Sequence, residues 1–303
     1  MDCFELSDEK LAEKIRQDQI DILVDLSRHT AGNRLLAFAM KPAPIQVSYM
    51  GCPNTTGLTA IDYRITDDYI NPQEMSEAFS SENLVRIPSC YCYRPVDDTP
   101  DISECPSLQN SCITFGSFNY YSKMNPTVLA LWAEVLNAIT ASKLLLKTKV
   151  LADESMQEAL KEQFARLGVA PERLILETSS PAPAYLKNYY QVDIGLDTYP
   201  YNGGTTTCEA LWMGIPVVTL VGETHASRMG LSILSTIGLT ELIAYTHEEY
   251  VDICIKLAND TEYLQKLRAG MRERMQASPL MDGAGLTHQL EKEYRKMWEK
   301  WCN

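Results

Sequence analysis

Short apolar runs alternate with longer segments whose apolar residues recur every three or four positions. The short runs predict buried parallel strands, and the longer segments predict amphipathic helices. The predicted strands are 20–26, 45–50, 63–66, 84–87, 113–118, 143–147, 174–177, 193–196, 216–220 and 242–244. The predicted helices are 11–17, one that ends at Met40, 126–138, 154–167, 184–190, 205–213, 226–236, 247–259, 261–276 and 285–301. This alternation predicts the α/β class, with parallel sheets covered on both faces.

A change in composition divides the predicted elements into two lobes. Residues 94–111 contain three prolines, several acidic residues and little apolar periodicity, which is typical of a linker between lobes. We therefore predict a first Rossmann-like lobe over 1–95, a linker over 96–111 and a second Rossmann-like lobe over 112–303. The chain opens in mid-pattern, on a helix that would normally follow an earlier strand, so the first lobe is expected to be incomplete.

The stretch 193–223 reads as strand, tight loop, helix and strand, with two glycines and three threonines where the first strand turns into the helix. Such a turn presents backbone N–H groups and the positive end of a helix dipole, which suit the phosphates of a nucleotide. Glu209 lies one turn into the helix, where a carboxylate can accept hydrogen bonds from a ribose diol. The alternative is that the glycines only make a turn and the threonines only cap the helix.

Composition narrows the classes of partner. The net charge of −13 disfavours nucleic acid, because nonspecific binding to a phosphate backbone rests on Lys and Arg. No apolar run approaches a membrane span and the amino terminus lacks a signal-peptide pattern, so no membrane partner is expected and a cytoplasmic location is the default. The nine cysteines are scattered and predict free thiols. No acidic pair predicts a metal site, and Asp67-Asp68 and Asp97-Asp98 are expected on solvated loops.

Five motifs then carry a family resemblance. They are DILVDLSRHTAGNRL, KPAPIQVSYMGCPNTTGL, DYRITD, FGSFNYYSKMNP and DTYPYNGGTTTCEALWMGIPVVTLVGETHASRMG. In this order they resemble the catalytic region of the O-GlcNAc transferase / SPINDLY family, glycosyltransferase family 41, and the bacterial members look closest. The resemblance implies a GT-B fold and inverting transfer of a sugar to Ser or Thr of a protein acceptor, with UDP-GlcNAc as the expected nucleotide-sugar donor. It implies no metal and no other cofactor.

The resemblance also assigns roles to individual positions. Lys123 matches the family lysine that touches the diphosphate, the catalytic position. Gly204, Thr205 and Thr206 match the segment that cradles the phosphates, and Glu209 matches the acidic residue that binds the ribose. The loop 51–57, with Thr55 and Thr56, matches the loop that closes over sugar and phosphate. A lysine and aimed N–H groups would stabilise the charge that grows on the leaving diphosphate.

Three further candidates remain, and two of them, His29 and Arg228, have more than one interpretation. His29, at the end of a strand, either faces the acceptor or sugar or has a structural role. Arg228 either hydrogen-bonds across the lobe or helps to hold the pyrophosphate, or it makes a salt bridge at the start of a helix. Tyr185 stands where many family members have a histidine beside the uracil, and Arg28 replaces a usual glycine.

The departures from the family leave other functions open. Relative to the family pattern, this sequence is expected to lack the first strand and loop of the amino-terminal lobe and the usual tetratricopeptide array. A missing segment or repeat domain could be supplied elsewhere. A noncatalytic nucleotide-sugar-binding module is one alternative, and O-fucosyl transfer from GDP-fucose is another. A different GT-B-like enzyme, such as a UDP-sugar epimerase, is disfavoured because the motifs are of another type.

Overall fold

The computed structural model describes residues 3–180 and 184–303. The chain forms two compact units, Met1–Cys92 with Asp282–Asn303, and Tyr93–Met281. Each unit contains one parallel β-sheet, as the pattern of apolar runs predicts. No helix in the described part of the chain is long and apolar enough to cross a bilayer.

The first unit holds a four-stranded parallel sheet in the order β1-β2-β3-β4. Its strands are β1 (Ile22–Asp25), β2 (Ile45–Ser48), β3 (Tyr63–Thr66) and β4 (Asn83–Arg86). Its helices are α1 (Asp8–Gln17), α2 (Leu35–Ala39), α3 (Gln73–Ser76) and the long terminal helix α12 (Gly283–Cys302). Every residue of β2 is buried, which agrees with its position inside the sheet.

The second unit holds a six-stranded parallel sheet in the order β10-β9-β8-β5-β6-β7. Its strands are β5 (Thr114–Ser117), β6 (Lys143–Lys147), β7 (Leu174–Glu177), β8 (Ile194–Leu196), β9 (Val217–Leu220) and β10 (Ile243–Ala244). This is the order of a doubly wound dinucleotide-binding sheet, in which the direction of winding reverses between two central strands. Here the reversal lies between β5 and β8, so their carboxyl ends mark the expected binding edge.

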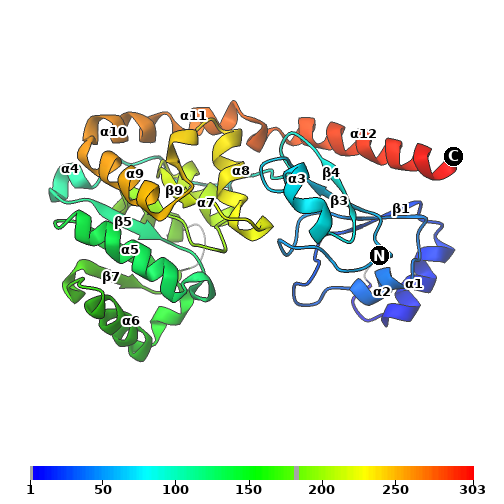
Figure 1. The fold of residues 1–303 in the computed structure, drawn as a ribbon, viewed down its shortest axis with the longest axis horizontal. Helices are drawn as coiled ribbons and strands as arrows, with labels where there is room; N and C mark the ends of the chain where they lie inside the picture. Colours follow the sequence, from blue (N-terminus) through cyan, green and yellow to red (C-terminus); the bar gives the residue numbers. More distant parts are fainter. Residues whose placement is uncertain (1–2, 181–183) are drawn as a thin grey trace. The chain divides into compact units, whose positions relative to one another are not determined.

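Helices cover this sheet. They are α4 (Ser107–Asn110), α5 (Pro126–Ala138), α6 (Glu154–Arg166), α7 (Thr205–Trp212), α8 (Met229–Thr236), α9 (His247–Asn259), α10 (Thr261–Ala269) and α11 (Met271–Gln276). Helix α5 packs against α9, and α7 packs against α11 (Figure 1). The predicted helix 261–276 is divided at Gly270, and the predicted helix 184–190 is a 3-10 helix, Ala184–Gln191.

Local sequence signals set the helix ends. The side chain of Asn125 accepts a hydrogen bond from the Val128 N–H, and Pro126 occupies the first turn of α5. Asp282 caps α12 in the same way, through the Gly285 N–H. The apolar face of α5 then buries Trp132 completely. All nine cysteines are free, as predicted, and four of them are buried.

The boundaries of the two units differ from those predicted from the sequence. The pattern assigns 112–303 to one lobe, yet the structure groups Asp282–Asn303 with the first unit, where α12 packs on β2. Residues 96–111 belong to the second unit and contain α4. The reason for the second difference is Arg268, a buried side chain that composition alone does not reveal. Its guanidinium donates to the carbonyls of Val192, at 2.9 Å, and of Ser103, at 3.3 Å.

We predict that Arg268→Ala destabilises the second unit by about 3 kcal/mol, because it leaves several buried carbonyls without their donor. Urea unfolding of the chain would measure the loss. Arg166→Ala is the matched control, since Arg166 makes an exposed ion pair with Glu162 and its loss should change stability by less than about 0.5 kcal/mol. Equal effects of the two substitutions would contradict the anchoring role of Arg268.

Candidate functional site

The candidate site of the second unit lies at the carboxyl ends of β5 and β8. Strand β8 ends at Leu196, residues 197–204 form a loop, and α7 begins at Thr205. Strand β5 ends at Ser117 and is followed by Phe118 and Asn119. These two connections flank the point where the sheet reverses its winding, which is where open α/β sheets bind ligands.

A buried carboxylate, that of Asp197, holds the loop after β8. Its Oδ1 accepts hydrogen bonds from the N–H groups of Thr198, at 2.8 Å, and Gly203, at 2.6 Å. Its Oδ2 accepts from the Thr219 hydroxyl at 2.7 Å. Burial raises the pKa of Asp197 to about 6, although these hydrogen bonds and the charge of Lys123 favour the ionised form. The carboxylate is therefore ionised at neutral pH and fixes the course of the loop.

Lys123 reaches the same loop from the short helix after β5. Its ammonium donates to the backbone carbonyl of Asn202 at 2.7 Å and lies 4.1 Å from the centroid of the Tyr201 ring. Burial lowers the pKa of Lys123, and the charge of Asp197 opposes this shift. The lysine is thus a half-buried cation that is bonded to the loop leading into α7.

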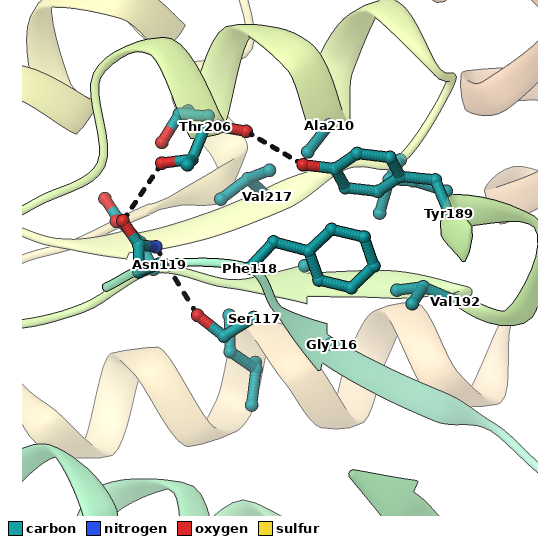
Figure 2. Close-up of a pocket in the computed structure, with 14 residues that line it drawn as sticks. Gly116, Ser117, Phe118, Asn119, Tyr189, Val192, Thr206, Ala210 and Val217 are labelled. Atoms are coloured by element: carbon teal, nitrogen blue, oxygen red, sulfur yellow. Dashed lines mark hydrogen bonds between the residues drawn. The ribbon is translucent and has the colours of Figure 1, made fainter. Parts of the chain in front are cut away.

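The amino terminus of α7 carries no side-chain cap, because Gly204 occupies the cap position. A Cβ at the neighbouring Gly203 would lie 2.4 Å from the Thr207 hydroxyl, so only glycine fits there. Thr206 donates from its hydroxyl to the Asn119 side chain at 2.9 Å, which joins the start of α7 to the end of β5 (Figure 2). The first turn of α7 is therefore held against the sheet with its dipole directed at the loop.

The stacked rings of Phe118 and Tyr189 lie against the first turn of α7. The rings of Phe118 and Tyr189 stack with centroids 4.1 Å apart, and the Tyr189 hydroxyl donates to the Thr206 carbonyl at 3.5 Å (Figure 2). Burial raises the pKa of Tyr189 well above its ordinary value, so this residue remains a neutral donor. The pair thereby ties the 3-10 helix before β8 to both β5 and α7.

A pocket of about 560 Å³ opens beside α7. Glu209 and Tyr185 line it, and the Tyr185 hydroxyl donates to the Glu209 carboxylate. Burial raises the pKa of Glu209, and the hydrogen bond from Tyr185 opposes the rise. Lys147 lines the pocket as well and is only 7% exposed, with its ammonium 2.6 Å from the Thr178 carbonyl. The other lining residues are Phe118, Asn119, Tyr120, Thr148, Lys149, Ser179, Ser180, Thr205 and Thr206.

Arg228 lies in the next connection, between β9 and α8. It precedes α8, and its guanidinium donates to the Gly222 carbonyl at 3.1 Å. This hydrogen bond to a backbone carbonyl is different from the salt bridge that the sequence offered as one alternative, and it joins Arg228 to the loop before α8. The loop in turn contacts the candidate site, because the Asn202 N–H donates to the Ala226 carbonyl at 2.8 Å.

The candidates of the first unit gather at the carboxyl ends of its strands. The His29 Nε2 lies 2.9 Å from the Thr55 carbonyl, so it carries the proton and donates. The Thr55 hydroxyl donates to Glu82 at 2.7 Å, and the Thr56 N–H donates to the same carboxylate at 2.6 Å. Burial raises the pKa of Glu82, but the hydrogen bonds from Thr56 and Thr55 outweigh burial and lower it overall. His29, Thr55 and Thr56 therefore form one hydrogen-bonded loop anchor.

Arg28 completes this anchor from the buried side. Its side chain is 1% exposed and donates to the Ser48 hydroxyl at 2.8 Å and to the Cys52 carbonyl at 2.9 Å. The close approach of the loop requires Gly51, whose φ is +72° and whose Cβ would lie 2.8 Å from the Ser27 carbonyl. The arginine thus binds the ends of β1 and β2 to the loop 51–57.

Sequence reasoning missed four residues that build the second-unit site: Asp197, Asn202, Asn119 and Lys147. Asp197 directly follows an apolar strand, and Lys147 ends another, so a polar residue at the end of a predicted buried strand is the signal that could have found them. The side chains of Asn119 and Asn202 act through long-range hydrogen bonds, which sequence spacing does not show.

The two carboxylates of the Asp67-Asp68 pair lie in different environments. Asp67 was expected on a solvated loop, and this is wrong: it is fully buried, and its carboxylate accepts from the Ile70 N–H at 2.8 Å. Its neighbour Asp68 is exposed. Within residues 3–180 and 184–303, no three His, Cys, Asp or Glu residues form a group that could hold a metal ion.

Comparison with known proteins identifies the family. Residues 4–94 and 104–290 match glycosyl transferase family 41. The chain belongs to this family. The resemblance seen in the five sequence motifs is therefore confirmed, and it extends over both units of the family 41 chain.

Relatives of this family 41 chain include a probable UDP-N-acetylglucosamine-peptide N-acetylglucosaminyltransferase SPINDLY from Petunia hybrida. The two sequences are 42% identical over 309 residues, which cover 100% of this chain and 32% of the relative. The chain thus spans about a third of the length of that relative.

Solved structures define the fold. A mutant O-GlcNAc transferase of Thermobaculum terrenum is 39% identical and superimposes with a TM-score of 0.92, covering 99% of this chain and 57% of that one. A sucrose-phosphate synthase of Thermosynechococcus elongatus is 14% identical, with a TM-score of 0.61 over 98% of this chain and 79% of that one. The α/β fold with its parallel sheets is that of the GT-B glycosyltransferases.

We predict that Glu82→Gln destabilises the first unit by about 2 kcal/mol at pH 7, because the Thr55 and Thr56 donors lose a charged acceptor. The folded-state pKa of Glu82 is below its ordinary value of 4.5. The stability that ionised Glu82 contributes is therefore present above pH 4.5 and is lost as the pH falls through the folded-state pKa. Urea unfolding should show that the difference in unfolding free energy between the parent and Glu82→Gln becomes smaller at acidic pH.

The control for this experiment is Glu291→Gln, because Glu291 is an exposed carboxylate of α12 in the same unit. Its replacement should change the unfolding free energy by less than about 0.5 kcal/mol at either pH. If the loss of unfolding free energy in Glu82→Gln does not change with pH, the ionised Glu82 carboxylate is not what holds Thr55 and Thr56.

Proposed function

We propose that this chain is the catalytic region of an inverting glycosyltransferase that moves GlcNAc from UDP-GlcNAc to Ser or Thr of proteins. The proposal rests on family 41 membership together with three features at one edge of the second-unit sheet. They are the Lys123 ammonium, the amino terminus of α7 with Gly204 at its cap position, and the Glu209 carboxylate. The names printed for the relatives, peptide N-acetylglucosaminyltransferase and O-GlcNAc transferase, support this donor and acceptor class.

The diphosphate of the donor would bind at the amino terminus of α7. Gly204, Thr205 and Thr206 supply the helix start, whose N–H groups and dipole favour an anion. Lys123 supplies the full positive charge beside it. Glu209, one turn further along α7, would accept from the ribose hydroxyls, and the pocket that contains Tyr185 and Lys147 would receive the base.

The chemistry of transfer requires charge stabilisation at the diphosphate. As the bond between the sugar and the diphosphate breaks, negative charge grows on the leaving group. The Lys123 ammonium and the α7 dipole interact more strongly with this transition state than with the bound donor, which lowers the barrier. Because hydrogen bonds already fix the loop through Asp197, little rearrangement is needed during the reaction.

The remaining elements of the proposal follow the sequence predictions. Transfer proceeds without a metal ion, since Lys123 and α7 perform the charge stabilisation. The loop anchored by His29, Thr55 and Thr56 is assigned to the sugar and phosphate side of the donor, and Arg228 supports the neighbouring loop. The activity is placed in the cytoplasm, and its acceptors are protein Ser and Thr hydroxyls.

We predict that the chain binds UDP more tightly than GDP, and that EDTA leaves the affinity for UDP unchanged. Isothermal titration calorimetry with UDP, GDP, UDP-GlcNAc and GDP-fucose would measure these affinities. Tighter binding of GDP and GDP-fucose would contradict UDP-GlcNAc as the donor and would indicate a guanine nucleotide sugar instead. The absence of binding to every one of them would refute a nucleotide-sugar site.

We predict that Lys123→Ala lowers turnover by about a hundredfold or more, equivalent to about 3 kcal/mol of barrier, with a much smaller loss of UDP affinity. The reason is that the lysine meets charge that develops mainly in the transition state. Glu209→Ala should instead raise the Michaelis constant for the donor with a smaller change in turnover. A transfer assay with a peptide acceptor would provide both constants.

Lys161→Ala is the control for Lys123→Ala. Lys161 lies on α6 and pairs with Glu158 on the same helix, so its removal should leave both kinetic constants at the parental values. Turnover by Lys123→Ala at the parental rate would show that Lys123 is not the group that stabilises the leaving diphosphate.

A further inference from the structure

We propose that Tyr185 is a positioning residue for ribose recognition: its hydroxyl holds the Glu209 carboxylate in the orientation that accepts the ribose hydroxyls of the donor. The inference rests on the proposed nucleotide-sugar function and adds a residue to it. The observations that carry it are the direct hydrogen bond from Tyr185 to Glu209, the position of both groups in one pocket and the rigid support of the helix that carries Tyr185.

The contact uses only part of the carboxylate. The Tyr185 hydroxyl donates to Oε1 of Glu209. An ionised carboxylate has about four acceptor positions, so one donated hydrogen bond leaves it able to accept from two adjacent hydroxyls as well. A ribose diol offers this pair of donors.

The hydroxyl also opposes the effect of burial on Glu209. Burial favours the neutral acid, which has fewer acceptor positions than the carboxylate, whereas a donated hydrogen bond favours the ionised form. Burial and the neighbouring Glu209 raise the pKa of Tyr185 itself, so the phenol keeps its proton and remains a donor at neutral pH. The hydrogen bond from Tyr185 thus favours the ionised form of Glu209 in a pocket where burial favours the neutral acid.

The support of Tyr185 explains why its hydroxyl can fix a partner. Tyr185 and Tyr189 belong to the same 3-10 helix, Ala184–Gln191. Tyr189 is buried, stacks on Phe118 and donates to the Thr206 carbonyl of α7. Both tyrosines therefore contact α7, Tyr189 at its first turn and Tyr185 at Glu209. This double attachment restricts the motion of the phenol relative to the carboxylate.

The decisive experiment compares nucleotides that differ by one ribose hydroxyl. Calorimetry would measure UDP and 2′-deoxyUDP with the parent chain, Tyr185→Phe, Glu209→Gln and the double variant. We expect Tyr185→Phe to weaken UDP binding by about fivefold to tenfold and to reduce the preference for UDP over 2′-deoxyUDP. In the Glu209→Gln background, the same substitution should have a much smaller effect, because the tyrosine acts through the carboxylate.

The pH dependence provides a second readout. Loss of the hydroxyl should move the acid-side decline of UDP affinity to higher pH, since Glu209 would then protonate more readily. The other groups near the pair are Lys147 and Lys149 in the pocket, Glu177 paired with Lys147, and Tyr189 and Tyr93. All of these are common to parent and variant, as is the phosphate of UDP, so the difference between the two profiles reports on Glu209.

Tyr190→Phe is the matched control. The Tyr190 hydroxyl donates to the Asp101 carbonyl at 2.8 Å, and Tyr190 is not among the residues that line the nucleotide pocket. Its replacement should leave UDP affinity, the deoxyribose preference and the pH profile unchanged. Thermal unfolding of each variant would verify that the fold is retained.

The outcomes separate the two levels of the proposal. If the parent binds UDP but Tyr185→Phe weakens UDP and 2′-deoxyUDP by the same factor, additively with Glu209→Gln, Tyr185 contacts the nucleotide directly and the positioning role is wrong. Unchanged UDP affinity in Tyr185→Phe would refute it as well. If the parent prefers GDP, 2′-deoxyGDP replaces 2′-deoxyUDP with the same expectations. If it binds neither UDP nor GDP, the nucleotide-sugar function itself fails, and the role of Tyr185 fails with it.

Discussion

The candidate site depends on one buried charge, the carboxylate of Asp197. It accepts two backbone N–H groups from the loop after β8 and the hydroxyl of Thr219 on β9. A buried carboxylate is costly unless donors surround it, so this set of donors is also what keeps the group ionised. The loop cannot relax without exposing that charge to an apolar interior. The positions of Gly203, Gly204 and the first turn of α7 follow from this constraint.

Lys123 completes the same electrostatic arrangement. Its ammonium favours the ionised form of Asp197, and Asp197 in turn raises the pKa that burial lowers. The lysine bonds directly to a neutral carbonyl, that of Asn202, rather than to a carboxylate. A neutral partner leaves the cation able to attract an additional anion, whereas a direct ion pair would compete with it. The positive charge of Lys123 therefore lies beside the start of α7 and is not consumed by a direct ion pair with Asp197.

Much of the fold could be predicted from the sequence, because apolar runs and caps are local signals. The strands at 193–196 and 216–220 and the helix capped by Asn125 follow directly from such patterns. The grouping of α12 with the first unit could not be predicted, since an amphipathic helix does not specify which sheet it covers. Likewise, sequence spacing locates Glu209 on a helix but does not show that Tyr185 donates to it.

The return of α12 to the first unit has a consequence for the order of folding during synthesis. The second unit is continuous in sequence, Tyr93–Met281, so all of its strands and helices are available once that stretch has left the ribosome. The first unit begins earlier but includes Asp282–Asn303, which is synthesised after the whole of the second unit. Domains generally fold as units as they emerge. Here the sheet of the first unit cannot bury the part of β2 that α12 covers until α12, which follows the second unit in sequence, has been synthesised.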